Sequence, residues 1–251
     1  MRNNSYKEIK PGETYVNNSG DEYTITAVTS SNNIAIRYND LHQYECITTA
    51  GHIREGRLKN PYAPSVHVVG YMGVGPYVAS INRTKTLEYH IWSGILERCY
   101  SANRSVNHQT YLNCRVCNEW HNFQIFAHWY VTHPDYGKGY DIDKDVMVPG
   151  NTLYSPSTCC MLPSVINKAL VGRHDTRELP TGVYYNTNKT RYVVKLRKNN
   201  EMIHGGTYDD PILAGQIYHA LKSEYLSELA NAWREHIQPD VYFKLINWSN
   251  R

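Results

Sequence analysis

A run of charged and turn-forming residues between positions 140 and 167 constrains the fold more than any other part of the chain. Its Pro149-Gly150-Asn151 sequence interrupts regular structure, because proline lacks a backbone donor and glycine adopts conformations that other residues avoid. Residues 140–148 fit an extended strand, and the Ser155-Pro156 pair predicts the start of a helix. We therefore expect a strand, a loop and a helix, in that order.

Three acids alternate along the predicted strand. Successive side chains of a strand point to opposite faces, so Asp141, Asp143 and Asp145 would share one face and repel one another. A bound cation would relieve that repulsion, and carboxylate oxygens are the preferred ligands of Mg²⁺ and Ca²⁺. Lys144 would lie on the opposite face and could join the acids only where the strand ends or bulges.

The segment resembles the core of phage-encoded HNH endonucleases, also called His-Me finger endonucleases. In that family a short strand carries Asp-His, a loop carries Asn, and a following helix carries a third polar ligand. Asp143, Asn151 and Asn167 match these positions. Lys144 replaces the His that activates the attacking water, and a lysine at its usual pKa is protonated and cannot act as that base.

The resemblance implies a phage DNA endonuclease, of homing or nicking type, that hydrolyses phosphodiester bonds with a divalent metal. Asp143, with Asp145 or Asn167, would hold Mg²⁺ against the scissile phosphate. Asn151 would position the loop, and Lys144 would stabilise the developing charge. Two alternatives stay open. The missing His favours a catalytically degenerate DNA-binding protein, and a module that binds a host protein is the third possibility.

Four of the six cysteines suggest a structural zinc site. The Cys-x-x-Cys pair Cys114 and Cys117 can bring two thiolates to one Zn²⁺, and Cys159 would follow at a helix start. Cys160 is adjacent to Cys159, and two adjacent cysteines are awkward ligands for one ion, so Cys99 is a competing candidate for the remaining ligand position. Such a site resembles a treble clef, a scaffold on which many HNH nucleases are built. The alternative is that these thiols are buried and pack as small apolar side chains.

The C-terminal part predicts three strands followed by a helix. Residues 182–186, 191–198 and 201–208 are β-prone and joined by Asn-rich turns, and Asp210 with Pro211 predicts a helix N-terminus. This pattern resembles the Apetala-type DNA-binding domain over roughly residues 180–236. Alternation places Val194 and Leu196 toward the helix and leaves cations on the open face. The expected DNA-binding residues are Lys189, Arg191, Lys195, Arg197 and Lys198.

Short alternating runs between residues 12 and 57 predict a small antiparallel barrel or curled sheet, in which Tyr23, Ile25 and Ala27 share a face. Apolar residues at helical spacing predict helices over 87–100 and from Asn118 onward. The expected architecture is α+β in three parts. These are an N-terminal small β domain (1–60), a connector with the HNH-like core (61–175), and an Apetala-type domain with a C-terminal tail (176–251).

Composition limits the classes of binding partner that we expect. A formal net charge of +3 over 251 residues is too small to indicate a nucleic-acid binder by itself, so a basic surface must be local. The sequence has neither a signal-peptide pattern nor an apolar run near the roughly 20 residues that a bilayer-spanning helix needs. We expect a soluble protein of the cytoplasm, the host cytoplasm for a phage protein, that binds double-stranded DNA and no membrane.

Overall fold

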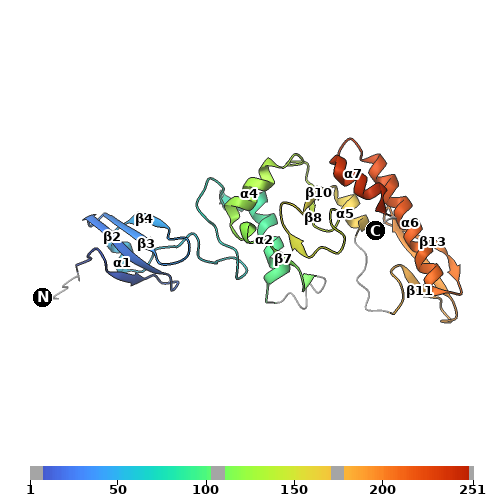
Figure 1. Ribbon diagram of the computed structural model, residues 1–251, viewed down its shortest axis with the longest axis horizontal. Helices are drawn as coiled ribbons and strands as arrows, with labels where there is room; N and C mark the ends of the chain where they lie inside the picture. The colour runs from blue at the N-terminus through green and yellow to red at the C-terminus, as the bar shows by residue number, and fades with distance from the viewer. Residues whose placement is uncertain (1–7, 103–110, 171–177, 249–251) are drawn as a thin grey trace. The chain divides into compact units, whose positions relative to one another are not determined.

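The computed structural model describes residues 8–102, 111–170 and 178–248 (Figure 1). Contacts divide the chain into two compact units. The first comprises Met1–Leu96 with His121–Phe126, and the second comprises Glu97–Trp120 with Ala127–Arg251. The described parts of the chain combine helices with several small sheets, so the fold is of the mixed helix and strand class.

The first unit begins with a four-stranded antiparallel sheet whose strands neighbour one another in chain order. They are β1 (Thr14–Val16), β2 (Glu22–Ser30), β3 (Asn33–Tyr38) and β4 (Glu45–Thr48). Strands β1 and β4 are the two edges, so among the described residues the sheet does not close and the barrel-like expectation is wrong. Closure would require the first and last strands to pair, and in the described sheet the three-residue strand β1 pairs only with β2. The short helix α1 (Ala50–Arg54) follows, and its Ile53 joins the core of the sheet.

Alternation along β2 and β3 correctly predicted most of this core. Tyr23, Ile25, Ile34 and Ile36 are all buried. Ala27 was expected on the same face but is exposed, because the pairing of β2 with β3 shifts register between Ile25 and Ala27. A bulge of this kind turns the following side chains to the other face of the sheet.

Helical periodicity also gave correct results. The helix α2 (Leu87–Tyr100) spans the predicted residues, and buried Trp92 and Ile95 lie on its apolar side. A short hairpin of β5 (Ser80–Ile81) and β6 (Thr84–Lys85) precedes it. The next helix starts as a 3-10 turn, η2 (Asn118–His121), before α4 (Phe123–Thr132). Among the helices described here, none combines the length and the apolar character needed to cross a membrane.

The second unit contains the segment with the three acids. The predicted strand is shorter than expected, because β8 ends at Asp143 (Asp141–Asp143). It pairs antiparallel with β10 (Cys160–Leu162), while β7 (Arg115–Val116) pairs in parallel with β9 (Leu153–Tyr154). Asp145 therefore lies outside the strand, so the expectation of three acids on one strand face is wrong.

The helix after this loop begins later than predicted. The residues after Ser155 form a turn and then strand β10, and α5 (Ser164–Leu170) starts only after Pro163. Buried Cys160 and Leu162 pair with β8, and this pairing with a strand far along the chain overrides the local helix signal. Asn167, the residue expected on the following helix, lies within α5.

The C-terminal strands and helix agree with the prediction. The sheet is formed by β11 (Val183–Tyr185), β12 (Tyr192–Lys198) and β13 (Glu201–Tyr208), with β12 in the centre. The helix α6 (Pro211–Ala232) is capped by Asp210, whose carboxylate accepts the Ile212 backbone N–H at 2.9 Å. Figure 1 shows α6 running along the sheet, and Val183, Val194 and Ala214 pack between them. A last helix, α7 (Pro239–Ile246), packs on α6.

One hydrophobic core joins the elements on both sides of residues 171–177. Val146 and Leu162 from the loop and strand region, Ile166 from α5, Leu196 from β12 and Leu226 from α6 all belong to it. The sequence predicted a domain boundary at 175/176. In the structure, residues before and after that position share this core.

Candidate functional site

The chain turns sharply after Asp143, and the Asp143 carboxylate holds the turn. Its Oδ1 accepts the backbone N–H groups of Asp145 at 2.8 Å and of Val146 at 2.7 Å. Burial raises the pKa of Asp143 above its ordinary value, although these two hydrogen bonds act in the opposite direction. One carboxylate oxygen is thus committed to backbone structure, and Oδ2 makes no hydrogen bond within the described residues.

Lys144 is buried behind this turn, with only 8% of its surface exposed. Its ammonium donates to both carboxylate oxygens of Asp145, at 2.8 Å each, and to the Asn151 carbonyl at 2.9 Å. Burial alone would lower the pKa of Lys144, but the hydrogen bond and charge of Asp145 raise it by more. Lys144 therefore remains a cation, and its three donors bind the two sides of the loop together.

Two asparagines complete the local framework. The Asn151 amide donates to the carbonyls of Lys144 at 2.9 Å and Leu153 at 2.6 Å, and its Oδ1 accepts the Leu153 N–H at 3.0 Å. On α5, the Asn167 amide donates to Asp141 Oδ2 at 3.0 Å. The structure thus connects Asp141, which the sequence did not single out as a ligand, to a predicted site residue.

These residues offer oxygen donors of the kind that Mg²⁺ prefers. Asp141 and Asp143 are two residues apart on β8, so they share a face of that strand, and Asn167 bonds to one of them. Asp145 fits less well, because Lys144 occupies both of its carboxylate oxygens. A divalent ion would fit Asp141, Asp143 and Asn167 in donor chemistry.

The four cysteines of the predicted zinc site lie in the second unit, and none of them forms a disulfide within the described residues. Cys114 and Cys117 flank β7, Cys99 lies in the last turn of α2, and Cys159 immediately precedes β10. Burial raises the pKa of Cys117 to about 11 and that of Cys159 to about 12. Across residues 8–102, 111–170 and 178–248, no three His, Cys, Asp or Glu side chains are grouped so that they could hold one metal ion. Zinc binding stays a prediction.

The predicted DNA-binding residues separate into two groups. Arg191 binds Asp209 through two hydrogen bonds of 2.6 and 3.1 Å, and Lys198 pairs with Glu228 of α6. Lys189 lies in the turn between β11 and β12, in a left-handed conformation. The other two cations, Lys195 and Arg197, form the second group.

Lys195 and Arg197 are exposed on β12, on either side of buried Leu196. They form no ion pair within the described residues. Their cross-strand neighbours on β13 are His204 and Met202, so no carboxylate stands opposite either cation. The Lys195 ammonium lies over the Tyr184 ring, 5.5 Å from the ring centroid, and this cation–π contact favours that position of the side chain.

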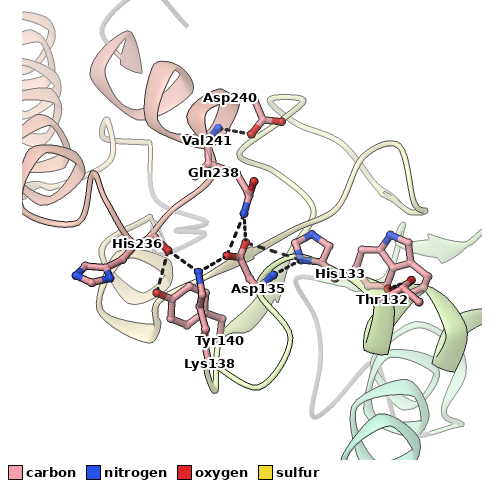
Figure 2. Close-up of polar contacts among 10 residues, drawn as sticks. Thr132, His133, Asp135, Lys138, Tyr140, His236, Gln238, Asp240 and Val241 are labelled. Carbon is pink, nitrogen blue, oxygen red and sulfur yellow. Dashed lines mark hydrogen bonds and ion pairs between the residues drawn. The ribbon is translucent and has the colours of Figure 1, made fainter.

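A further polar cluster, centred on Asp135, was not found from the sequence (Figure 2). Asp135 is almost completely buried, and both of its carboxylate oxygens accept the Gln238 amide at 3.1 Å. The Lys138 ammonium donates to the same carboxylate at 2.7 Å and to the His236 carbonyl at 3.3 Å, and the Tyr140 hydroxyl donates to that carbonyl at 3.1 Å. The cluster fastens residues 135–140 to the segment that leads into α7.

His133 beside this cluster lines a cavity of about 300 Å³ together with Ser157 and Cys159. Burial lowers the pKa of His133 below its ordinary value, although the nearby carboxylates oppose the shift. Its Nδ1 accepts the Asp135 backbone N–H at 3.1 Å, so the neutral ring carries its proton on Nε2. The ring is a donor in this arrangement and is not poised as a general base.

Comparisons with known proteins add no family assignment: no family model matches the chain, and no curated protein or solved structure gives a significant match.

Proposed function

We propose that this protein binds double-stranded DNA through the open face of the β11–β12–β13 sheet. The observation that carries the proposal is the exposure of Lys195 and Arg197 on that face without a carboxylate opposite either one. A twisted three-stranded sheet fits the major groove, where Lys and Arg reach phosphates or guanine edges. Arg191 and Lys198 are ion-paired, so they contribute less to the free charge of the surface.

Charge reversal tests this surface. Lys195→Glu and Arg197→Glu leave the buried neighbours Val194 and Leu196 intact, so both variants should fold. If both cations contact phosphate, the double variant should bind all sequences more weakly. Its plot of log affinity against log salt should become shallower by about 1.8 units, at about 0.9 per lost contact.

Lys244→Glu, which reverses an exposed cation on α7, is the matched control. Fluorescence anisotropy with labelled duplexes at several salt concentrations gives both the affinity and the slope. A folded double variant that binds every duplex as tightly as the control would refute the DNA-binding proposal and leave the module that binds a host protein as the better reading.

A second activity, DNA hydrolysis, is favoured by the oxygen donors of Asp141, Asp143 and Asn167. A Mg²⁺ bound there would supply a Lewis acid for the scissile phosphate. The chain itself holds the Lys144 ammonium behind the turn, and Asn151 keeps the loop closed. No general base matches the family's His, so the catalytically degenerate DNA-binding protein is the competing proposal.

The variant Asp143→Asn distinguishes a metal-dependent nuclease from a catalytically degenerate DNA-binding protein. The amide oxygen can still accept the backbone N–H groups of Asp145 and Val146, so the turn is kept while the negative charge is lost. Incubation of supercoiled and linear DNA with Mg²⁺, Mn²⁺ or EDTA should show metal-dependent nicking by the wild type only, with DNA affinity unchanged or slightly higher in the variant. No nicking by the wild type with any divalent metal would favour the degenerate binder.

A further inference from the structure

A cavity of about 610 Å³ lies where α5, α6 and the β11–β12–β13 sheet meet. Its size falls within the roughly 300 to 1,000 Å³ that is typical of small-ligand sites. Strand β11 is short, so it leaves the last part of β12 without a neighbour on that side. Leu196 and Arg197 of this uncovered stretch line the cavity together with the Asn199–Asn200 turn.

Four residues with cationic side chains, from three elements, contribute to the lining of this cavity. Lys168 comes from α5, Lys195 and Arg197 come from β12, and Lys222 comes from α6. No carboxylate is among the described lining residues. Like charges gathered around one space repel one another, and an anion in that space would relieve the repulsion.

Lys222 is the most informative of the four. Only 7% of its surface is exposed, and its ammonium donates to the Ala169 carbonyl in the last turn of α5. It forms no ion pair within the described residues. A buried ammonium without a counter-charge is costly, and most buried charges in proteins are paired or bind a ligand. Lys168, one residue before Ala169, adds a second cation at the same end of the cavity.

Aromatic rings line the same space. Tyr184 of β11 and Tyr218 of α6 contribute to the wall. Tyr225 also lines the cavity. Its hydroxyl accepts the Asn199 backbone N–H and donates to the Asn199 side-chain oxygen, both at 3.1 Å, and so fixes the Asn199–Asn200 turn. Tyrosine rings beside a basic groove are the usual surfaces on which nucleic-acid bases stack.

We propose that this cavity binds a phosphorylated nucleotide, with the phosphate beside Lys168 and Lys222 and the base against the tyrosines. The nucleotide has two possible sources, a free mononucleotide or the phosphorylated end of a DNA strand. The strand source rests on the proposed DNA-binding function. The free-nucleotide source does not, because Lys168 and Lys222 lie outside the open sheet face.

Isothermal titration calorimetry on the full chain tests the site. The probes are deoxyadenosine 5′-monophosphate, deoxyadenosine, inorganic phosphate, and single-stranded oligonucleotides with and without a 5′-phosphate. Lys222→Met removes the buried charge at similar volume and should weaken binding of the phosphorylated probe about tenfold or more, as expected for a lost charged hydrogen bond. Lys168→Ala, at an exposed position that should not affect folding, should weaken it about threefold. Lys244→Ala, on α7, should have no effect.

Binding of the mononucleotide that both variants weaken supports the free-nucleotide source. Binding only of the 5′-phosphorylated strand, with the same variant dependence, supports the strand source. The proposal is overturned if the phosphorylated probes bind no tighter than their unphosphorylated counterparts, or if neither variant changes their affinity. Duplex binding measured in parallel separates the two proposals, because nucleotide binding without duplex binding would refute only the DNA-binding face.

Discussion

Replacing Asn151 by alanine should destabilise the second unit measurably, whether or not the protein has an activity. The Asn151 side chain makes three hydrogen bonds to main-chain groups of Lys144 and Leu153, between 2.6 and 3.0 Å. Each net hydrogen bond contributes about 1 kcal/mol, so their loss should cost about 2 to 3 kcal/mol. A slope near 2 kcal/mol per molar urea converts this to a midpoint shift of about 1 to 1.5 M.

Tryptophan fluorescence during urea unfolding measures this shift. Four of the five tryptophans belong to the second unit, so the signal mainly reports that unit. Asn188→Ala is the matched control, because Asn188 is exposed in the β11–β12 turn and makes no hydrogen bond within the described residues. Equal midpoints for Asn151→Ala and Asn188→Ala would refute the argument that Asn151 holds the loop closed.

Three further predictions concern other parts of the second unit. Gly182→Ala should destabilise the protein more than Gly137→Ala in the same urea assay. Both glycines have positive φ, but only at Gly182 would the added carbon overlap the Tyr218 ring. Equal losses of stability in the two variants would exclude that clash. Burial lowers the pKa of Lys222 from 10.5, so the unfolded chain binds more protons between the lowered value and 10.5, and stability rises with pH across that window. Lys222→Met should remove this rise in stability and increase the melting temperature at pH 7. Thermal scans of the variant and the wild type at pH 7 and pH 10 measure both effects, and equal melting temperatures at each pH would contradict the prediction. Elemental analysis of protein purified without chelator should find about one zinc per chain, which Cys117→Ser should lose; folded wild-type protein without metal would assign the thiols to packing.

Features encoded by neighbouring residues were predictable from the sequence. Asp210 and Pro211 define the start of α6 within one turn, and the structure confirms both the cap and the preceding strands. The alternation along β12 likewise correctly predicted that Lys195 and Arg197 are exposed around buried Leu196. These signals depend on backbone geometry and local periodicity, which tertiary contacts reinforce here.

Features that depend on distant partners were not predictable. The helix expected at Ser155 is displaced because residues 160–162 pair with β8. Arg191 appears as a free cation in the sequence, yet it pairs with Asp209, 18 residues away. The partners of Asp135 are more distant still, since Gln238 lies 103 residues along the chain. No local sequence pattern predicts a contact between residues so far apart in the chain.

The common core of Val146, Leu196 and Leu226 has a consequence for how the two proposed activities would work together. Leu196 lies between Lys195 and Arg197, and Val146 lies in the turn that Asp143 holds. One packed interior therefore anchors both the open face of the sheet and the turn after Asp143. Such an interior resists deformation. If both proposals hold, the protein would nick DNA at a fixed number of base pairs from the site that the sheet face contacts.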